Sequence, residues 1–156
     1  MPFPISYEGQ FKFSGNYGSV DDIILYIESA LRKRIAKILF HKVDSVTFQG
    51  KYYIGFKPFP ILQMVSKGMV KITEDGNGIL VNYRLEFTRL IVMCLLFAVL
   101  VILFGVDHNI NDVLKIIYGV LSISVVLTIL FFLEYFITIK RFQIYLMRLL
   151  KKAVVR

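Results

Sequence analysis

The sequence has little of the chemistry on which many catalytic and metal-binding sites depend. Its 156 residues include one cysteine, two histidines and no tryptophan. The single cysteine, Cys94, excludes an intramolecular disulfide and any metal site built on several cysteines. No Gly-x-Ser-x-Gly segment occurs, and neither histidine has an evident partner for nucleophilic catalysis. The first five residues lack a basic region followed by an apolar run, so we expect no secretory signal. We expect that the protein is not an enzyme and that it binds no cofactor or metal.

Charge is absent from two long stretches, 90–106 and 116–133, which hold no Asp, Glu, Lys or Arg. A helix needs about 20 mostly apolar residues to cross a bilayer, with a range of roughly 17 to 25. Strands of a membrane barrel have polar residues at every second position, and these stretches do not. In lipid they therefore satisfy their backbone hydrogen bonds as helices. We therefore predict a transmembrane helical hairpin over 89–139, with helices at about 89–106 and 113–139.

The charges around these stretches give the predicted hairpin an orientation. Its loop carries Asp107 and Asp112 and no Lys or Arg, whereas basic residues lie beyond both outer ends. Cytoplasmic flanks are enriched in Lys and Arg, and Lys115, near the start of the second helix, can extend its amine to the headgroups. We therefore predict a two-pass protein of the inner (plasma) membrane with both termini in the cytoplasm.

The last 17 residues hold six basic side chains and no acid, so most of the net charge of +8 comes from this tail. Because the positive charge is concentrated in one segment, we predict no nucleic-acid partner. Apolar residues recur there at helical spacing, which predicts a basic amphipathic helix over 140–156. Such a helix can lie on an anionic leaflet or pack back on the N-terminal domain. We favour the leaflet, with headgroup contacts from Lys140, Arg141, Arg148, Lys151 and Lys152.

Glu134 is the one acid within the predicted membrane helices. An intramembrane carboxylate is a candidate for an ion or proton relay. Glu134 lies only six residues before Lys140, however, and Arg89 lies at the matching end of the first helix. We therefore favour an interhelical or interfacial charge pair between Arg89 and Glu134.

Residues 1–88 carry 11 basic and 8 acidic side chains, the mixed surface of an ordinary folded domain. Ser19 with Asp22 three residues later predicts a helix start, and apolar residues at helical spacing extend this helix over 20–40. A break in alternation at Gly9 predicts a bulge or bend in a first strand over 3–13. Strands are also predicted over 43–48 and 52–56, flanking a turn at Gln49 and Gly50, and over 69–73 and 79–87 around Gly76.

These elements predict an α+β fold, an antiparallel sheet with one long helix, followed by the transmembrane hairpin and the C-terminal amphipathic helix. Helix-grip and bacterial pleckstrin-like folds share a curved sheet with one long helix, and no motif here selects either.

Three further polar positions have ordinary structural explanations. Residues 15–19 follow a strand and open a helix, as phosphate loops do, but they lack the Gly-Lys-Ser/Thr ending and precede two aspartates. His108 lies among short polar residues that suit a loop and a helix start, and His41 is placed at a helix end. We expect a plain turn and no metal or proton site.

The predicted function is that of an integral membrane protein whose small cytoplasmic domain binds a partner protein or lipid headgroups. The alternative is an oligomeric pore or channel gated by that domain, with Ser122, Ser124 and Thr128 as lining residues. The expected partners are membrane lipids, and further a membrane protein complex or other copies of the chain.

Overall fold

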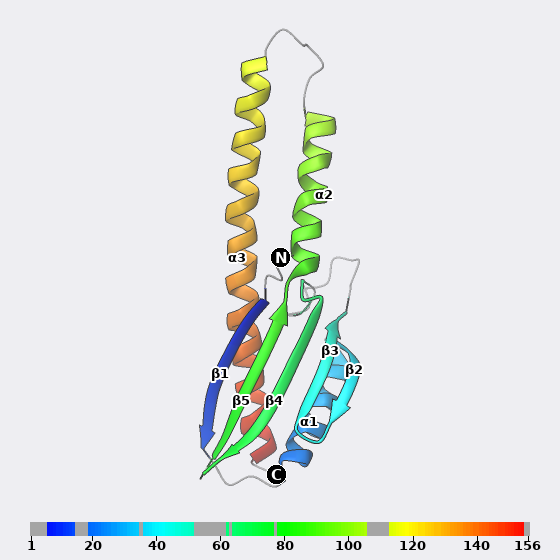
Figure 1. The fold of residues 1–156 in the computed structure, drawn as a ribbon, viewed down its shortest axis with the longest axis vertical. Coiled ribbons are helices and arrows are strands. Elements are labelled where there is room, and N and C mark those ends of the chain that lie inside the picture. Colours follow the sequence, from blue (N-terminus) through cyan, green and yellow to red (C-terminus); the bar gives the residue numbers. More distant parts are fainter. Residues whose placement is uncertain are drawn as a thin grey trace.

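The computed structural model of the protein describes residues 6–14, 19–34, 36–51, 62, 64–76, 78–105 and 113–154. The elements of this part of the chain are, in order, β1 (Ser6–Ser14), α1 (Val20–Arg34), β2 (Ala36–Lys42), β3 (Ser45–Gly50), β4 (Lys67–Asp75), β5 (Gly78–Glu86), α2 (Thr88–Gly105) and α3 (Val113–Val154). The strands form one antiparallel sheet in the order β1-β5-β4-β3-β2, and α1 and the C-terminal part of α3 pack on it (Figure 1).

The start of α1 is capped as the sequence predicts. The backbone N–H of Asp22 donates to Ser19 Oγ at 3.1 Å, and that hydroxyl donates to the Asp22 carboxylate at 2.7 Å. Ile24, Ile27 and Leu31 recur at helical spacing and are fully buried. Burial of this stripe against the sheet, more than helix propensity, holds a helix of this length.

The helix ends earlier than predicted. α1 stops at Arg34, and residues 36–42 form β2, which pairs with β3 around a turn at 43–44. The predicted helix to Phe40 is wrong because residues 36–42 form a strand, and the predicted turn at Gln49 and Gly50 is wrong because both residues lie within β3. The predicted strand over 52–56 lies outside the described residues. The apolar residues of β2 have a spacing that fits a helix as well as a strand. The segment forms a strand because it pairs with β3, with Ile38 opposite Phe48.

β1 pairs with β5 residue by residue from Ser6 to Ser14 without a shift in register. A bulge at Gly9, one of the two predicted alternatives, is therefore wrong for this part of the chain, and the bend stays a prediction. The hairpin between β4 and β5 is confirmed, with Gly76 in its turn at a φ of +58°. Glycine takes a positive φ without the steric cost that a side chain carries.

The C-terminal part of α3 belongs to the core of the domain. α3 continues without interruption to Val154, and Phe142, Leu146 and Leu150 are fully buried with the core residues of the sheet. The Phe142 ring lies 5.7 Å from the Phe48 ring and 5.6 Å from the Tyr83 ring, between centroids. The apolar face of the tail therefore packs back on the domain, the arrangement that the sequence analysis held as its alternative.

The predicted two-helix transmembrane hairpin is wrong. In the part of the chain that the structure describes, one stretch, Leu121–Ala153 of α3, is long and apolar enough to cross a membrane. The second half of this stretch packs on the sheet, with Phe142, Leu146 and Leu150 buried in the core. Two-pass placement in the inner membrane with both termini cytoplasmic is wrong for the same reason.

α2 and the first part of α3 lie side by side beyond one end of the sheet (Figure 1). Large apolar side chains on both helices are about half exposed to solvent: Val92, Leu95, Leu96, Val99, Leu121, Val125, Val126, Ile129, Leu130, Phe132, Leu133 and Phe136. We call these residues the exposed apolar surface. Contiguous apolar surface of this kind associates with other apolar groups in water.

Candidate functional site

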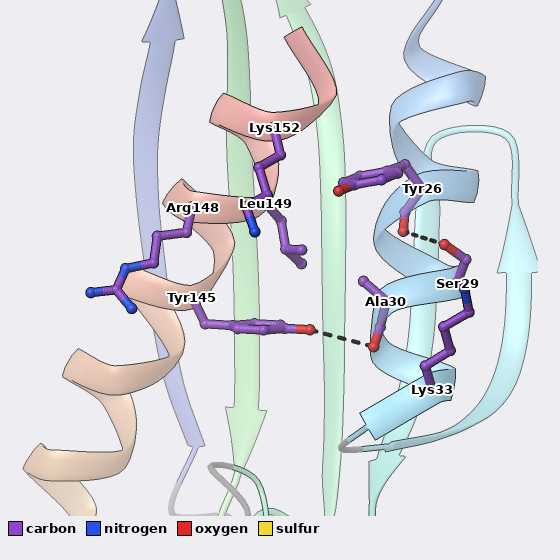
Figure 2. Close-up of a pocket in the computed structure, with 8 residues that line it drawn as sticks. All are labelled: Tyr26, Ser29, Ala30, Lys33, Tyr145, Arg148, Leu149 and Lys152. Carbon is purple, nitrogen blue, oxygen red and sulfur yellow. Dashed lines mark hydrogen bonds between the residues drawn. The ribbon is translucent and has the colours of Figure 1, made fainter. Parts of the chain in front are cut away.

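The candidate site is a cleft of about 490 Å³ between α1 and the C-terminal part of α3 (Figure 2). We call it the α1–α3 cleft. Each helix contributes four residues at the i, i+3, i+4, i+7 spacing that places side chains on one face: Tyr26, Ser29, Ala30 and Lys33 from α1, and Tyr145, Arg148, Leu149 and Lys152 from α3. Clefts of about 300 to 1,000 Å³ are typical of small-molecule sites.

The charge of the α1–α3 cleft is of one sign. Lys33, Arg148 and Lys152 are basic, and none of the eight lining residues is acidic. All three cations are exposed, so water weakens the field of each, and all three border one concave surface. Such a surface attracts anions, and the attraction falls with salt over a Debye length of about 8 Å at physiological ionic strength.

Uncharged polar groups and apolar groups complete the lining. The Tyr145 hydroxyl donates to the Ala30 carbonyl at 3.4 Å, a contact between the two helices, while Ser29 Oγ donates to the Tyr26 carbonyl at 2.8 Å. The Tyr26 and Tyr145 rings extend toward the opposite helix, whereas the Arg148 guanidinium extends away from α1 (Figure 2). Leu149 is 8% exposed. The cleft therefore combines an apolar and aromatic interior with cations around it.

A second hollow, of about 340 Å³, lies on β1, β4 and β5 near Glu8, Gln10 and Asn82. Its one cation, Arg84, is neutralised locally, with Glu8 at 3.3 Å and Glu86 at 3.8 Å. Balanced charge on the wet face of a sheet is an ordinary surface feature. This hollow has no excess charge with which to select a ligand.

The described residues hold no group of three or more His, Cys, Asp or Glu side chains suited to a metal ion. His41, predicted at a helix end, lies in β2 instead, where its Nδ1 is 2.8 Å from the Glu28 carboxylate. Glu28 also contacts Arg32 at 2.7 Å. This small surface network joins α1 to β2. Residues 15–18 and His108, which carried other candidates, lie outside the described residues.

The five predicted headgroup contacts all lie on α3 and are exposed: Lys140, Arg141, Arg148, Lys151 and Lys152. Only Arg148 and Lys152 reach the α1–α3 cleft. The apolar face of this helix is buried in the core and is not available to insert into a leaflet. Headgroup contact by the five cations stays a prediction.

Arg89 and Glu134 are placed on different helices, as predicted, but in different surroundings. Arg89, at the start of α2, donates from its guanidinium to the Gly50 carbonyl at 3.0 Å. Glu134 is exposed on α3. The ion pairs among the described residues do not join the two, and their pairing stays a prediction. Thr128, a residue of the predicted pore, donates its hydroxyl to the Ser124 carbonyl of its own helix at 2.7 Å.

Six of the eight lining residues were not predicted from the sequence: Tyr26, Ser29, Ala30, Lys33, Tyr145 and Leu149. Their spacing on each helix is visible in the sequence, and it marks one face flanking each apolar stripe. Which two helix faces meet depends on how both helices sit on the sheet. No periodicity in either helix contains that information.

With a single candidate span among the described residues, the predicted integral membrane function is wrong, and so is its alternative of an oligomeric pore. Comparisons with protein-family models and with curated sequences find no match. Among solved structures, the di-domain ARO/CYC StfQ from the steffimycin biosynthetic pathway aligns at 12% identity and a TM-score of 0.36. The alignment covers 77% of this chain and 49% of that chain, so this chain spans about half the neighbour's length.

Proposed function

We propose that this protein is a binding module without catalytic activity, and that its α1–α3 cleft takes a ligand bearing a phosphate or similar anionic group. One observation carries the proposal: three cations and no acid line a concave site of about 490 Å³. Hydrogen bonds in which a partner is charged are roughly twice as strong as neutral ones. Lys33 borders the cleft from α1, and Lys152 borders it from α3.

The absence of catalysis is part of the proposal. Catalysis by acid and base needs groups within hydrogen-bond reach of a reacting atom, with pKa values near the working pH. The lining offers lysine, arginine, tyrosine and serine but no carboxylate or histidine. Binding of an anion requires only the cations that are present.

The anionic group has two sources, a membrane lipid headgroup or a free phosphate ester. Both present the same oxygen atoms to Lys33 and Lys152. We therefore test glycerol 3-phosphate in solution by calorimetry, and phosphatidylcholine vesicles with and without phosphatidylglycerol by flotation. Binding to the soluble ester alone assigns a free ligand, and binding to the anionic vesicles alone assigns a headgroup.

The deciding variant is Lys33→Gln with Lys152→Gln, and the matched control is Lys37→Gln with Lys42→Gln on β2. Both pairs remove two positive charges from exposed positions, but only the first lines the cleft. We expect the cleft variant to weaken binding about tenfold or more, roughly 1.4 kcal/mol, and the control to change it by much less. Equal losses in the two variants would mean that binding depends only on net charge, and this would overturn the proposal. Absence of binding to both probes would overturn it as well.

Association with membrane lipids, with a membrane protein complex or with other copies of the chain also remains proposed. The exposed apolar surface supports it, because apolar side chains half exposed over two helices favour contact with other apolar groups.

A further inference from the structure

The α1–α3 cleft is larger than an anion needs. A bare phosphate ion fills a small part of a cleft of about 490 Å³. Sites of this volume bury most of a drug-sized ligand, with apolar walls around a few polar groups that fix its orientation. A ligand that matches this cleft therefore has a body attached to its anionic group.

The walls of the cleft indicate the chemistry of that body. The Tyr26 and Tyr145 rings reach into the cleft from facing helices (Figure 2), and both side chains are half-buried. Leu149 and Ala30 add aliphatic surface, and Leu149 is almost entirely buried. Aromatic rings prefer offset stacking or edge-to-face contact with other rings, and such contacts add to the affinity that the buried area supplies.

The Tyr145 ring is also held in place. The Tyr145 hydroxyl bonds to the Ala30 carbonyl at 3.4 Å, which ties this ring to the opposite helix. The α3 backbone beneath it is anchored by Leu146, which is fully buried in the core. A ring restrained before binding loses little conformational entropy when a ligand arrives.

We propose that the ligand of the α1–α3 cleft is an aryl phosphate or a related aromatic anion, its ring beside Tyr26 and Tyr145 and its anionic group at Lys33 and Lys152. This inference rests on the proposed function and adds the class of the ligand. It predicts that the aromatic body and the anion both contribute to affinity.

Calorimetry with the full chain tests the class directly, using 1-naphthyl phosphate, octyl phosphate, inorganic phosphate and 1-naphthol as probes. We expect 1-naphthyl phosphate to bind at least tenfold more tightly than each of the other three. Equal binding of naphthyl and octyl phosphate would overturn the aromatic class and leave the anion site intact. Binding of none of the phosphates would overturn the proposed function itself, and tightest binding of 1-naphthol would overturn the role of the cations.

Variants locate the ring in the cleft. Tyr26→Leu keeps apolar volume without an aromatic ring, and we expect it to weaken naphthyl phosphate severalfold while leaving inorganic phosphate unchanged. Phe40→Leu is the matched control, because it removes an exposed aromatic ring on β2 outside the cleft, and we expect it to leave the binding of both ligands unchanged. Unchanged naphthyl phosphate binding in Tyr26→Leu would contradict the proposal. Circular dichroism checks the fold of each variant, and the ligand comparison above stands without any variant.

Discussion

Gly9 of β1 lies directly opposite Tyr83 of β5, and the Tyr83 ring occupies the space into which a side chain at position 9 would extend. Tyr83 is 3% exposed and contacts the Phe142 ring of α3. The missing side chain at Gly9 thus makes room for the ring that joins the sheet to the C-terminal helix.

Gly9→Ala should destabilise the fold. The added methyl group overlaps the Tyr83 ring, and overpacking of this kind costs about 1 to 3 kcal/mol. Gly119→Ala is the matched control, because a Cβ there meets nothing within 4 Å, and we expect it to stabilise α3 by up to about 1 kcal/mol. Denaturant unfolding in mild detergent measures both, and equal effects would contradict the close approach at Gly9.

Phe142→Ala should cost about 3 to 5 kcal/mol of unfolding free energy, because it empties a fully buried aromatic site between Phe48 and Tyr83. Ile144→Ala, on the same helix but 47% exposed, should cost less than about 1 kcal/mol. If the first variant does not fold, Phe142→Leu gives a smaller loss of the same sign. Similar stability of all three variants would mean that the tail does not pack on the sheet.

Alkaline pH should destabilise the protein through Tyr83. Burial raises the pKa of Tyr83 above its ordinary value of 10.0, with the neighbouring Tyr7 acting in the same direction. The unfolded chain loses this proton near pH 10 while the folded chain keeps it, so the contribution is complete below pH 10 and is lost as pH rises above it. Tyr83→Phe should therefore flatten the fall of stability above pH 10, by up to about 1.4 kcal/mol per pH unit. Parallel curves for the two proteins would contradict the assignment.

The exposed apolar surface should make the chain associate in water. We expect an apparent mass above that of a monomer in detergent-free buffer, and dispersal by mild detergent, in size-exclusion chromatography with light scattering. Phe136→Lys should reduce association, whereas Phe40→Lys is the control at a phenylalanine of β2 that is at least as exposed and lies outside this surface. A monomeric wild-type chain in plain buffer would contradict this expectation.

Several local features were predictable because they depend on a few neighbouring residues. The cap at Ser19 and Asp22 and the turn at Gly76 follow from short-range hydrogen bonding and backbone sterics. Alternation along β5 likewise follows from the period of two in a strand. The end of α1 was not predictable, because β2 forms only where β3 is available as its partner.

The candidate site was predictable only in part. Its cations in the tail were recognised, since a helix whose polar face is uniformly basic is visible in any sequence. Lys33 and the two tyrosines were missed, because the cleft exists only where α1 and α3 pack beside each other on the sheet.

The sequence by itself determined that long stretches of this chain are apolar and helical and that its C-terminal residues are basic on one face. Only the tertiary structure decided what covers the apolar face of the tail, with Phe142, Leu146 and Leu150 against the sheet instead of in a leaflet. Helical periodicity reports that a face avoids water. It does not report which apolar medium replaces the water, since lipid and a protein core satisfy the same side chains.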